Sequence, residues 1–206
     1  MTKIDLKKQL ARYYKTGTKE TEPHLVEVEP LQYVMVDGAG DPNSSEFANA
    51  TGLLYAVSYG VKFASRAAGR DYTVMALEGL WWTDPPEAFS MAARGEWHWT
   101  AMILQPEWIT RSMLDDAIGA AVEKGKVDSA TAAKARLETL DEGLSVQVLH
   151  VGPYETEPPK IAAMHEYARE QGYKLRGKHH EIYLGDPRRV APEKLKTILR
   201  HPVEPA

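Results

Sequence analysis

The chain has 206 residues, a formal net charge of -4 at pH 7 and no cysteine. The length suits one large domain or two fused halves, and the negative charge argues against nucleic acid as the main partner. Without cysteine, disulfides, thiolate metal sites and cysteine nucleophiles are excluded.

The N-terminal stretch MTKIDLKK lacks the apolar segment of a secretory signal, and no run approaches the roughly 18 apolar residues of a membrane span. We therefore expect a cytoplasmic protein with no membrane partner. Five Trp and ten Tyr stand against three Phe. Trp and Tyr combine a large apolar body with a polar group, so they suit the walls of wet pockets, although they also fill cores and cover their edges.

Residues 1–30 are mixed and charged, and they predict a short helix over 5–14 followed by a linker. This segment is too short for a helix-turn-helix domain with a connector. The next elements are predicted as strand, helix, strand and strand, with a break at Asp84, Pro85 and Pro86 after the second strand. Their ranges are 31–36, 46–66, 72–82 and 96–104.

Two helices, over 110–124 and 129–140, are predicted to follow, and then the first order of elements repeats. The second strand, helix, strand and strand cover 145–151, 159–171, 178–184 and 197–203, with a short helix starting at Pro192. We predict an α+β fold of two pseudo-symmetric βαββ repeats, with helices on the outside and a central ligand cleft. The expected domain spans 31–206 after the 1–30 segment, with repeats at 31–105 and 144–203 and a helical connector at 106–143.

The predicted strand near residue 181 has two different faces, because side chains alternate along a strand. Ile182 and Leu184 on one face suggest a helix-packed core. Glu181 and Tyr183 share the other face with His179, and we expect that face to line the cleft. A hydrated sheet edge is the alternative.

The equivalent strand of the first repeat is apolar on both faces. Met75 and Leu77 suggest its core, which places Glu78 and Trp82 toward the cleft, with Glu78 as the positional counterpart of Glu181.

Trp97 and Trp99 lie two residues apart on the next strand and project the same way. They either pack beneath a helix or line the cleft, and the cleft is favoured for Trp99.

A carboxylate surrounded by Trp and Tyr has two chemical uses. Desolvation raises its pKa, which makes it a better base near neutral pH. It also attracts cationic ligands, helped by the faces of the aromatic rings. The same site could therefore capture a ligand or activate a water molecule.

The seven histidines form no recognisable metal motif. His179 and His180 are adjacent and so face opposite ways, while His150 and His165 lie in other elements, and there is no His-Glu-x-x-His pattern. There is also no Gly-x-Ser-x-Gly elbow. We expect no metal ion and no other cofactor, and the basic residues near the C-terminus are expected to form a solvated face.

Several segments in order along the chain resemble the stand-alone GyrI-like small-molecule-binding proteins, and the stretch HHEIYL is the most specific. These segments are DLKK at 5–8, LEGLWW at 77–82, WHWTAMILQP at 97–106, QVLHVGPY at 147–154, HHEIYLGDPRR at 179–189 and TILR at 197–200.

The resemblance implies a fold similar to the effector domain of multidrug-responsive regulators such as BmrR and Rob, without their DNA-binding domain. In that superfamily a glutamate on the strand matching Glu181 lies in an aromatic drug pocket. Some stand-alone members hydrolyse the strained cyclopropane of DNA-alkylating natural products. The resemblance implies Glu181 and Tyr183 as the catalytic pair. The expected ligand-binding residues are Trp82, Trp97, Trp99, Glu78, His150, Tyr154 and His179.

Three functions remain open from the sequence. The first is ring-opening hydrolysis of a cyclopropane-bearing toxin, with Glu181 as general base. The second is binding of a small apolar or aromatic ligand, cationic ones included, without turnover, as a sink or sensor. The third is inhibition of a protein partner such as gyrase through an acidic surface. Either a monomer or a homodimer is compatible with the sequence.

Overall fold

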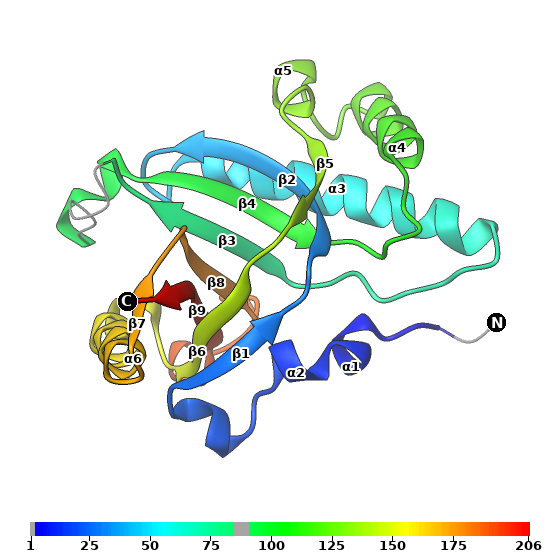
Figure 1. Ribbon diagram of the computed structural model, residues 1–206. Coiled ribbons are helices and arrows are strands. Elements are labelled where there is room, and N and C mark those ends of the chain that lie inside the picture. Colours follow the sequence, from blue (N-terminus) through cyan, green and yellow to red (C-terminus); the bar gives the residue numbers. More distant parts are fainter. Residues whose placement is uncertain (1–2, 85–90) are drawn as a thin grey trace. The chain divides into compact units, whose positions relative to one another are not determined.

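The computed structural model describes residues 3–84 and 91–206, and the chain divides into two compact units (Figure 1). Unit 1 comprises Met1–Gln9 and Leu31–Leu140, and unit 2 comprises Leu10–Pro30 and Asp141–Ala206. Pro85 and Pro86, which were expected to break the chain after a strand, lie outside the described residues. No helix in the described part of the chain is long and apolar enough to span a bilayer.

Unit 1 contains a four-stranded antiparallel arrangement in the order β3-β4-β2-β5, with helix α3 packed on β2 and β4. Its elements are α1 (Leu6–Gln9), β2 (Leu31–Ala39), α3 (Ser45–Ala67), β3 (Leu77–Trp82), η3 (Met91–Glu96), β4 (His98–Leu104), α4 (Arg111–Glu123), α5 (Ser129–Ala132) and β5 (Arg136–Leu140).

Unit 2 has the same strand order, β8-β9-β6-β1, with the short β7 paired to the end of β9 and helix α6 packed on β6. Its elements are α2 (Ala11–Tyr14), η1 (Thr18–Thr21), β1 (His24–Val28), β6 (Gly143–Val151), η4 (Tyr154–Thr156), α6 (Pro158–Glu170), β7 (Tyr173–Leu175), β8 (His179–Tyr183), η5 (Pro192–Lys194) and β9 (Lys196–Pro205).

The α+β class and the order strand, helix, strand, strand within each unit are confirmed. The predicted helix over 129–140 is wrong, because α5 ends at Ala132 and β5 follows it. β5 pairs along β2, and Arg136 of β5 forms an ion pair with Asp37 of β2. Pairing to an existing strand edge outweighs the helical propensity of this short segment.

Helix α3 begins and ends where its sequence indicates. The Ser44 hydroxyl accepts a hydrogen bond of 3.3 Å from the Phe47 amide, which caps the first turn. Leu54, Val57 and Val61 are fully buried at helical spacing. Gly69, with φ of 94°, lies just beyond the last turn, where a left-handed residue is commonly glycine.

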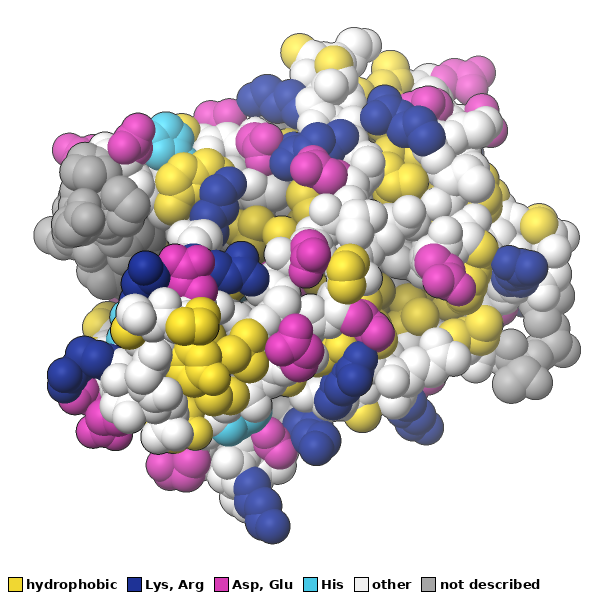
Figure 2. All heavy atoms as spheres, in the orientation of Figure 1, with side chains coloured by type: hydrophobic (Ala, Val, Ile, Leu, Met, Phe, Trp, Pro, Cys, Tyr) yellow, Lys and Arg dark blue, Asp and Glu magenta, His cyan; other side chains and the backbone are white. Residues whose placement is uncertain are grey.

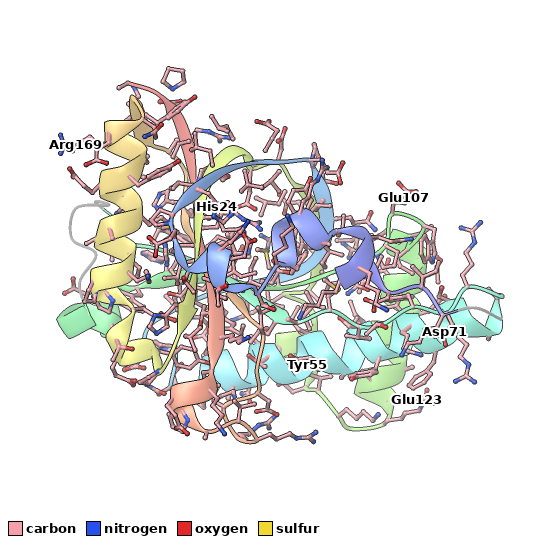
Figure 3. The ribbon with its side chains drawn as sticks, turned by 90° about the horizontal axis from the view of Figure 1, so that it is seen from below. His24, Tyr55, Asp71, Glu107, Glu123 and Arg169 are labelled. Carbon is pink, nitrogen blue, oxygen red and sulfur yellow. The ribbon has the colours of Figure 1, made fainter. Side chains whose placement is uncertain are left out.

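Helix α6 has one buried and one exposed side. Pro158 occupies its first turn, where the missing amide hydrogen costs nothing. Met164 and Ala168 are buried against the strands of unit 2. Glu166 and Arg169 form an ion pair on the exposed side, and Arg169 is marked on this helix in Figure 3.

The matching strand order and registers allow the two units to be compared position by position. Val36 in β2 and Val148 in β6 are each the sixth residue of a nine-residue strand. Each pairs with a residue of the next strand, and the paired residues form a row across the sheet. Both rows lie on the side of the sheet that the helix of the unit covers. The equivalent rows are Val36–Ala101–Gly79 in unit 1 and Val148–Leu199–Glu181 in unit 2. The counterpart of Glu181 is therefore Gly79, and the expected equivalence with Glu78 is wrong by one residue.

Candidate functional site

Glu181 lies on the side of its sheet that α6 covers, opposite to the side expected from the sequence. Val148 and Leu199 pack with Met164 of α6, and Leu199 pairs directly with Glu181 across the strands. Directly paired residues point to the same face. Ile182, on the other face, is fully buried as well, so an apolar residue on this strand does not identify the helix side.

Two neighbours on the same strand face hold the Glu181 carboxylate. The Tyr183 hydroxyl donates a hydrogen bond of 2.7 Å to Oε2, and Nε2 of His179 lies 3.3 Å from Oε1. The Glu181 side chain is 15% exposed. The hydrogen bond from Tyr183 orients the carboxylate, and the His179 ring lies beside its other oxygen.

A second carboxyl group, that of Glu157, interacts electrostatically with Glu181. Glu157 occupies the N-cap position of α6 and is buried, and its Oε1 accepts no hydrogen bond from the described residues. Burial, reinforced by the Glu181 charge, raises the pKa of Glu157 well above its ordinary value, while the Thr197 hydroxyl opposes the shift. A neutral carboxyl beside a carboxylate is the arrangement that separates a general acid from a general base.

Tyr154 completes the aromatic side of this group. Its ring meets the Tyr183 ring edge to face, with centroids 5.8 Å apart and planes at 80°. Burial, together with the Glu157 and Glu181 charges, raises the pKa of Tyr154 to about 12. The hydroxyl therefore keeps its proton at neutral pH and can donate a hydrogen bond.

His150 is held at the end of β6 by a tight turn. Its Nε2 lies 3.2 Å from the Pro153 carbonyl oxygen and 3.1 Å from the Thr156 hydroxyl. Burial lowers its pKa, which favours the neutral imidazole. At Gly152, whose φ is 142°, an added Cβ would lie 3.3 Å from this Nε2, so the turn depends on glycine.

The opposite face of β8 carries a buried ion network. Nδ1 of His180 lies 2.9 Å from Oε1 of Glu142, and Arg200 donates to Oε2 of Glu142 at 2.7 Å and to Gln147 at 2.9 Å. Burial alone would raise the pKa of Glu142, but the charges of His180 and Arg200 outweigh it and lower the pKa to about 2. All four side chains are buried, so this network belongs to the structural core of unit 2.

The aromatic residues of unit 1 that were expected to bind ligand divide into buried and partly exposed groups. Trp99 is fully buried, and its ring meets the Phe47 ring of α3 edge to face, with centroids 5.0 Å apart. Of the two expected arrangements for Trp99, the structure therefore shows packing beneath a helix. Trp97 is 5% exposed and contacts Trp81, with centroids 5.5 Å apart. Trp82 keeps part of its surface exposed.

Unit 1 also contains a hollow of about 190 Å³ beside Trp99. It is smaller than the roughly 300–1,000 Å³ of typical ligand pockets. Its lining residues are Val36, Asp37, Ser45, Glu46, Asn49, Ala50, Trp99, Thr131 and Lys134. Glu78 does not line it and is fully buried on the face of β3 away from Trp81.

The structure gathers five predicted residues into one group within unit 2: Glu181, Tyr183, Tyr154, His179 and His150. The four others, Trp82, Trp97, Trp99 and Glu78, belong to unit 1. Sequence reasoning missed Glu157, whose only signal is its place before the prolines that begin α6.

Comparison with known proteins shows the family and the fold of the chain. A family model described as the GyrI-like small molecule binding domain matches residues 21–204. No functionally curated protein matches the chain.

Solved structures agree with the family match. An uncharacterized conserved protein from Listeria innocua has 36% identity and a TM-score of 0.89, covering 98% of this chain and 100% of its own. A protein of the same organism described as a hydrolase has 35% identity, a TM-score of 0.87 and the same coverage. The C-terminal domain of EcmrR shares the fold alone, with a TM-score of 0.57 at 11% identity over 90% of this chain and 98% of that domain. The chain belongs to the GyrI-like small-molecule-binding domain family.

Proposed function

We propose that the protein binds a small, largely apolar molecule beside Glu181 and opens a strained cyclopropane ring in it by hydrolysis, as a defence against DNA-alkylating toxins. The observation that carries this proposal is the pair of carboxyl groups: Glu181, oriented by Tyr183 at 2.7 Å, and Glu157, whose pKa is raised by burial and by Glu181. Small-molecule binding by the family and the description of a Listeria innocua relative as a hydrolase are consistent with it.

The reaction needs one base and one acid. Glu181 takes a proton from water while the water oxygen bonds to a ring carbon, and the adjacent ring C–C bond breaks. The electron pair of that bond passes into the conjugated carbonyl, and the resulting enolate takes a proton from the Glu157 carboxyl group. The product is the substrate plus one water, and proton exchange with solvent restores both carboxyl groups.

Ring strain lowers the barrier, so the protein's task is orientation. We assign this task to Tyr183, Tyr154 and His150 around the carboxyl groups. Ligand binding by Trp82, which belongs to unit 1, stays a separate prediction. Trp99, which is fully buried, would act by supporting α3. A role for His179 beside Glu181 belongs to the same proposal, whereas the buried Trp97 and Glu78 of unit 1 are not part of it.

The test is incubation with a cyclopropane-bearing alkylating compound, followed by mass spectrometry of the compound. We expect a gain of one water with the unaltered protein. Glu181→Gln should abolish turnover while ligand binding, measured by Trp fluorescence, persists. Glu170→Gln, at an exposed position on α6, is the control and should behave as the unaltered protein. Full turnover by Glu181→Gln would remove the base role.

Binding without turnover is the second candidate, because the family model itself describes small-molecule binding. It predicts an unchanged ligand after incubation, and a Glu181→Gln effect that is largest for cationic ligands. Inhibition of gyrase by an acidic surface has less support. On the face shown in Figure 2, Lys and Arg side chains are interspersed with Asp and Glu side chains. That face therefore has no continuous acidic surface that could resemble DNA.

A further inference from the structure

Three histidines that the sequence places on separate elements meet within unit 2. His165 belongs to α6, His179 to β8 and His201 to β9, and one ring nitrogen of each lies within 4.8 Å of those of the other two. The rings of His165 and His201 meet edge to face with centroids 5.1 Å apart, and those of His179 and His201 are 6.0 Å apart.

Two of the three histidines carry a buried ring nitrogen whose hydrogen-bonding capacity is unused among the described residues. Nε2 of His165 and Nδ1 of His201 are buried and have no hydrogen-bond partner among the described residues. Buried nitrogen atoms of native proteins nearly always have a partner, which is water or an ion where the protein supplies none.

The surroundings of His165 and His201 favour the chemical form of imidazole that binds metal ions. Burial, reinforced by the neighbouring His179, lowers the pKa of His165 to about 4 and lowers that of His201 further. Both rings are therefore neutral at pH 7, and a neutral imidazole offers a lone pair to a metal ion.

Unit 1 shows that the fold does not require polar side chains at these positions. By the register described above, the equivalents of His179 and His201 are Leu77 and Ile103, which pair with each other across β3 and β4. The same part of the sheet is thus apolar in one unit and carries histidines in the other. Packing alone does not account for the histidines.

We propose that His165, His179 and His201 bind one divalent transition-metal ion of the zinc type. Three imidazoles suit zinc, which takes nitrogen ligands at about 2.0–2.1 Å in a tetrahedral arrangement and leaves one position for water. Such ligand atoms lie about 3.4 Å apart, so the present separations require only a small contraction through side-chain rotation.

The Glu181 carboxylate fits this site as an outer partner. Metal-binding imidazoles commonly give their second ring nitrogen to a carboxylate, which fixes the tautomer. Nε2 of His179 lies 3.3 Å from Oε1 of Glu181, so in this arrangement the ion would take Nδ1 of His179. The ion would then join α6 to β8 and β9 and hold His179 beside Glu181. This inference does not depend on hydrolysis by Glu181.

The proposal is tested by titrating chelator-treated full-length protein with Zn²⁺ by calorimetry and with Co²⁺ by visible absorption. We expect one ion per chain with micromolar or tighter affinity, and intense Co²⁺ bands typical of four-coordination. Zinc at about 100 times Kd should raise Tm by roughly 5 °C or more. His165→Gln and His201→Gln should each weaken binding on the order of 100-fold. His24→Gln should not, because His24, which is labelled in Figure 3, lies on β1, is paired with Glu20 and is not one of the three histidines.

Two results would overturn the metal site: no saturable binding to the folded, unaltered protein at 100-fold molar excess of Zn²⁺, or unchanged affinity in both variants. Far-UV circular dichroism establishes that each variant is folded. If His201→Gln does not fold, His165→Gln and His179→Gln decide the question. Binding of an apolar ligand to the chelator-treated protein tests the proposed function separately, so the two can fail independently.

Discussion

The hydroxyl of Tyr183 donates a hydrogen bond of 2.7 Å to Oε2 of Glu181, two residues back along the same strand face. Hydrogen bonds to charged groups contribute about 1.5–3 kcal/mol. Tyr183→Phe leaves the ring in place and removes this donor, so the carboxylate loses both its orientation and a stabilising partner. We expect kcat/KM for a cyclopropane substrate to fall by roughly 10- to 100-fold. Tyr59→Phe, on the exposed side of α3, should have no effect.

If Tyr183→Phe retained full kcat/KM, the hydroxyl would have no part in placing Glu181, and the carboxylate would be positioned by His179 alone. Measuring ligand affinity beside kcat separates these roles, because loss of orientation lowers kcat with little change in binding.

The raised pKa of Glu157 predicts a particular dependence of stability on pH. The folded state retains the Glu157 proton at pH values where the unfolded chain has lost it. Stability therefore falls as pH rises from the ordinary value of 4.5 toward the raised pKa, by up to about 1.4 kcal/mol per pH unit. Glu157→Gln removes this penalty. We expect the variant to be more stable than the unaltered protein at pH 8 and similar to it at pH 4.

Urea unfolding at both pH values provides the measurement, and Glu170→Gln, at an exposed position on α6, serves as the control. Equal stability of the unaltered protein and Glu157→Gln at pH 8 would contradict a raised pKa at this position.

The main elements could be predicted because local signals and tertiary packing agree in them. The Ser44 cap, the stripe through Leu54 and Val61, and Gly69 all define α3 without knowledge of its partners. β5 and β1 could not be found this way. Both are short edge strands whose pairing with β2 and β6 supplies the order that their own sequences lack.

Part of the group around Glu181 could be predicted from the sequence, but its placement could not. Alternation correctly grouped Glu181 with Tyr183 and His179, since it depends only on the backbone. The covered face was predicted wrongly, because Ile182 is buried on the side away from α6. Glu157 was missed because its proximity to Glu181 arises from helix α6 docking on the sheet, which no local pattern encodes.

The buried network of Glu142, His180 and Arg200 predicts a large loss of stability when one charge is removed. Arg200→Met would leave the Glu142 carboxylate in the core without its 2.7 Å partner. Breaking a buried pair on one side typically costs about 3–5 kcal/mol. Adding Glu142→Gln should recover part of the loss, because no charge is then left unpaired. Urea unfolding of the single and double variants measures the coupling between Arg200 and Glu142. If Arg200→Met and the double variant were equally stable, the loss of stability would not come from the unpaired charge.

Gly38 and Gly52 give opposite predictions for the same substitution. A Cβ added at Gly38 of β2 would lie 2.2 Å from the Trp99 ring, whereas at Gly52 in α3 nothing lies within 4 Å. Trp99 is fully buried against Phe47 and cannot move away without disturbing α3. We expect Gly38→Ala to destabilise unit 1 by about 1–3 kcal/mol or more through overpacking. Gly52→Ala should stabilise it by about 0.5–1 kcal/mol, because alanine is favoured over glycine inside a helix.

Thermal and urea unfolding followed by Trp fluorescence would measure both changes, and Gly38→Ala should also shift the emission, since Trp99 must be displaced. Equal stability of the Gly38→Ala and unaltered proteins would mean that β2 can move away from Trp99. The indole would then not be fixed between the strand and α3, and a ligand could displace it.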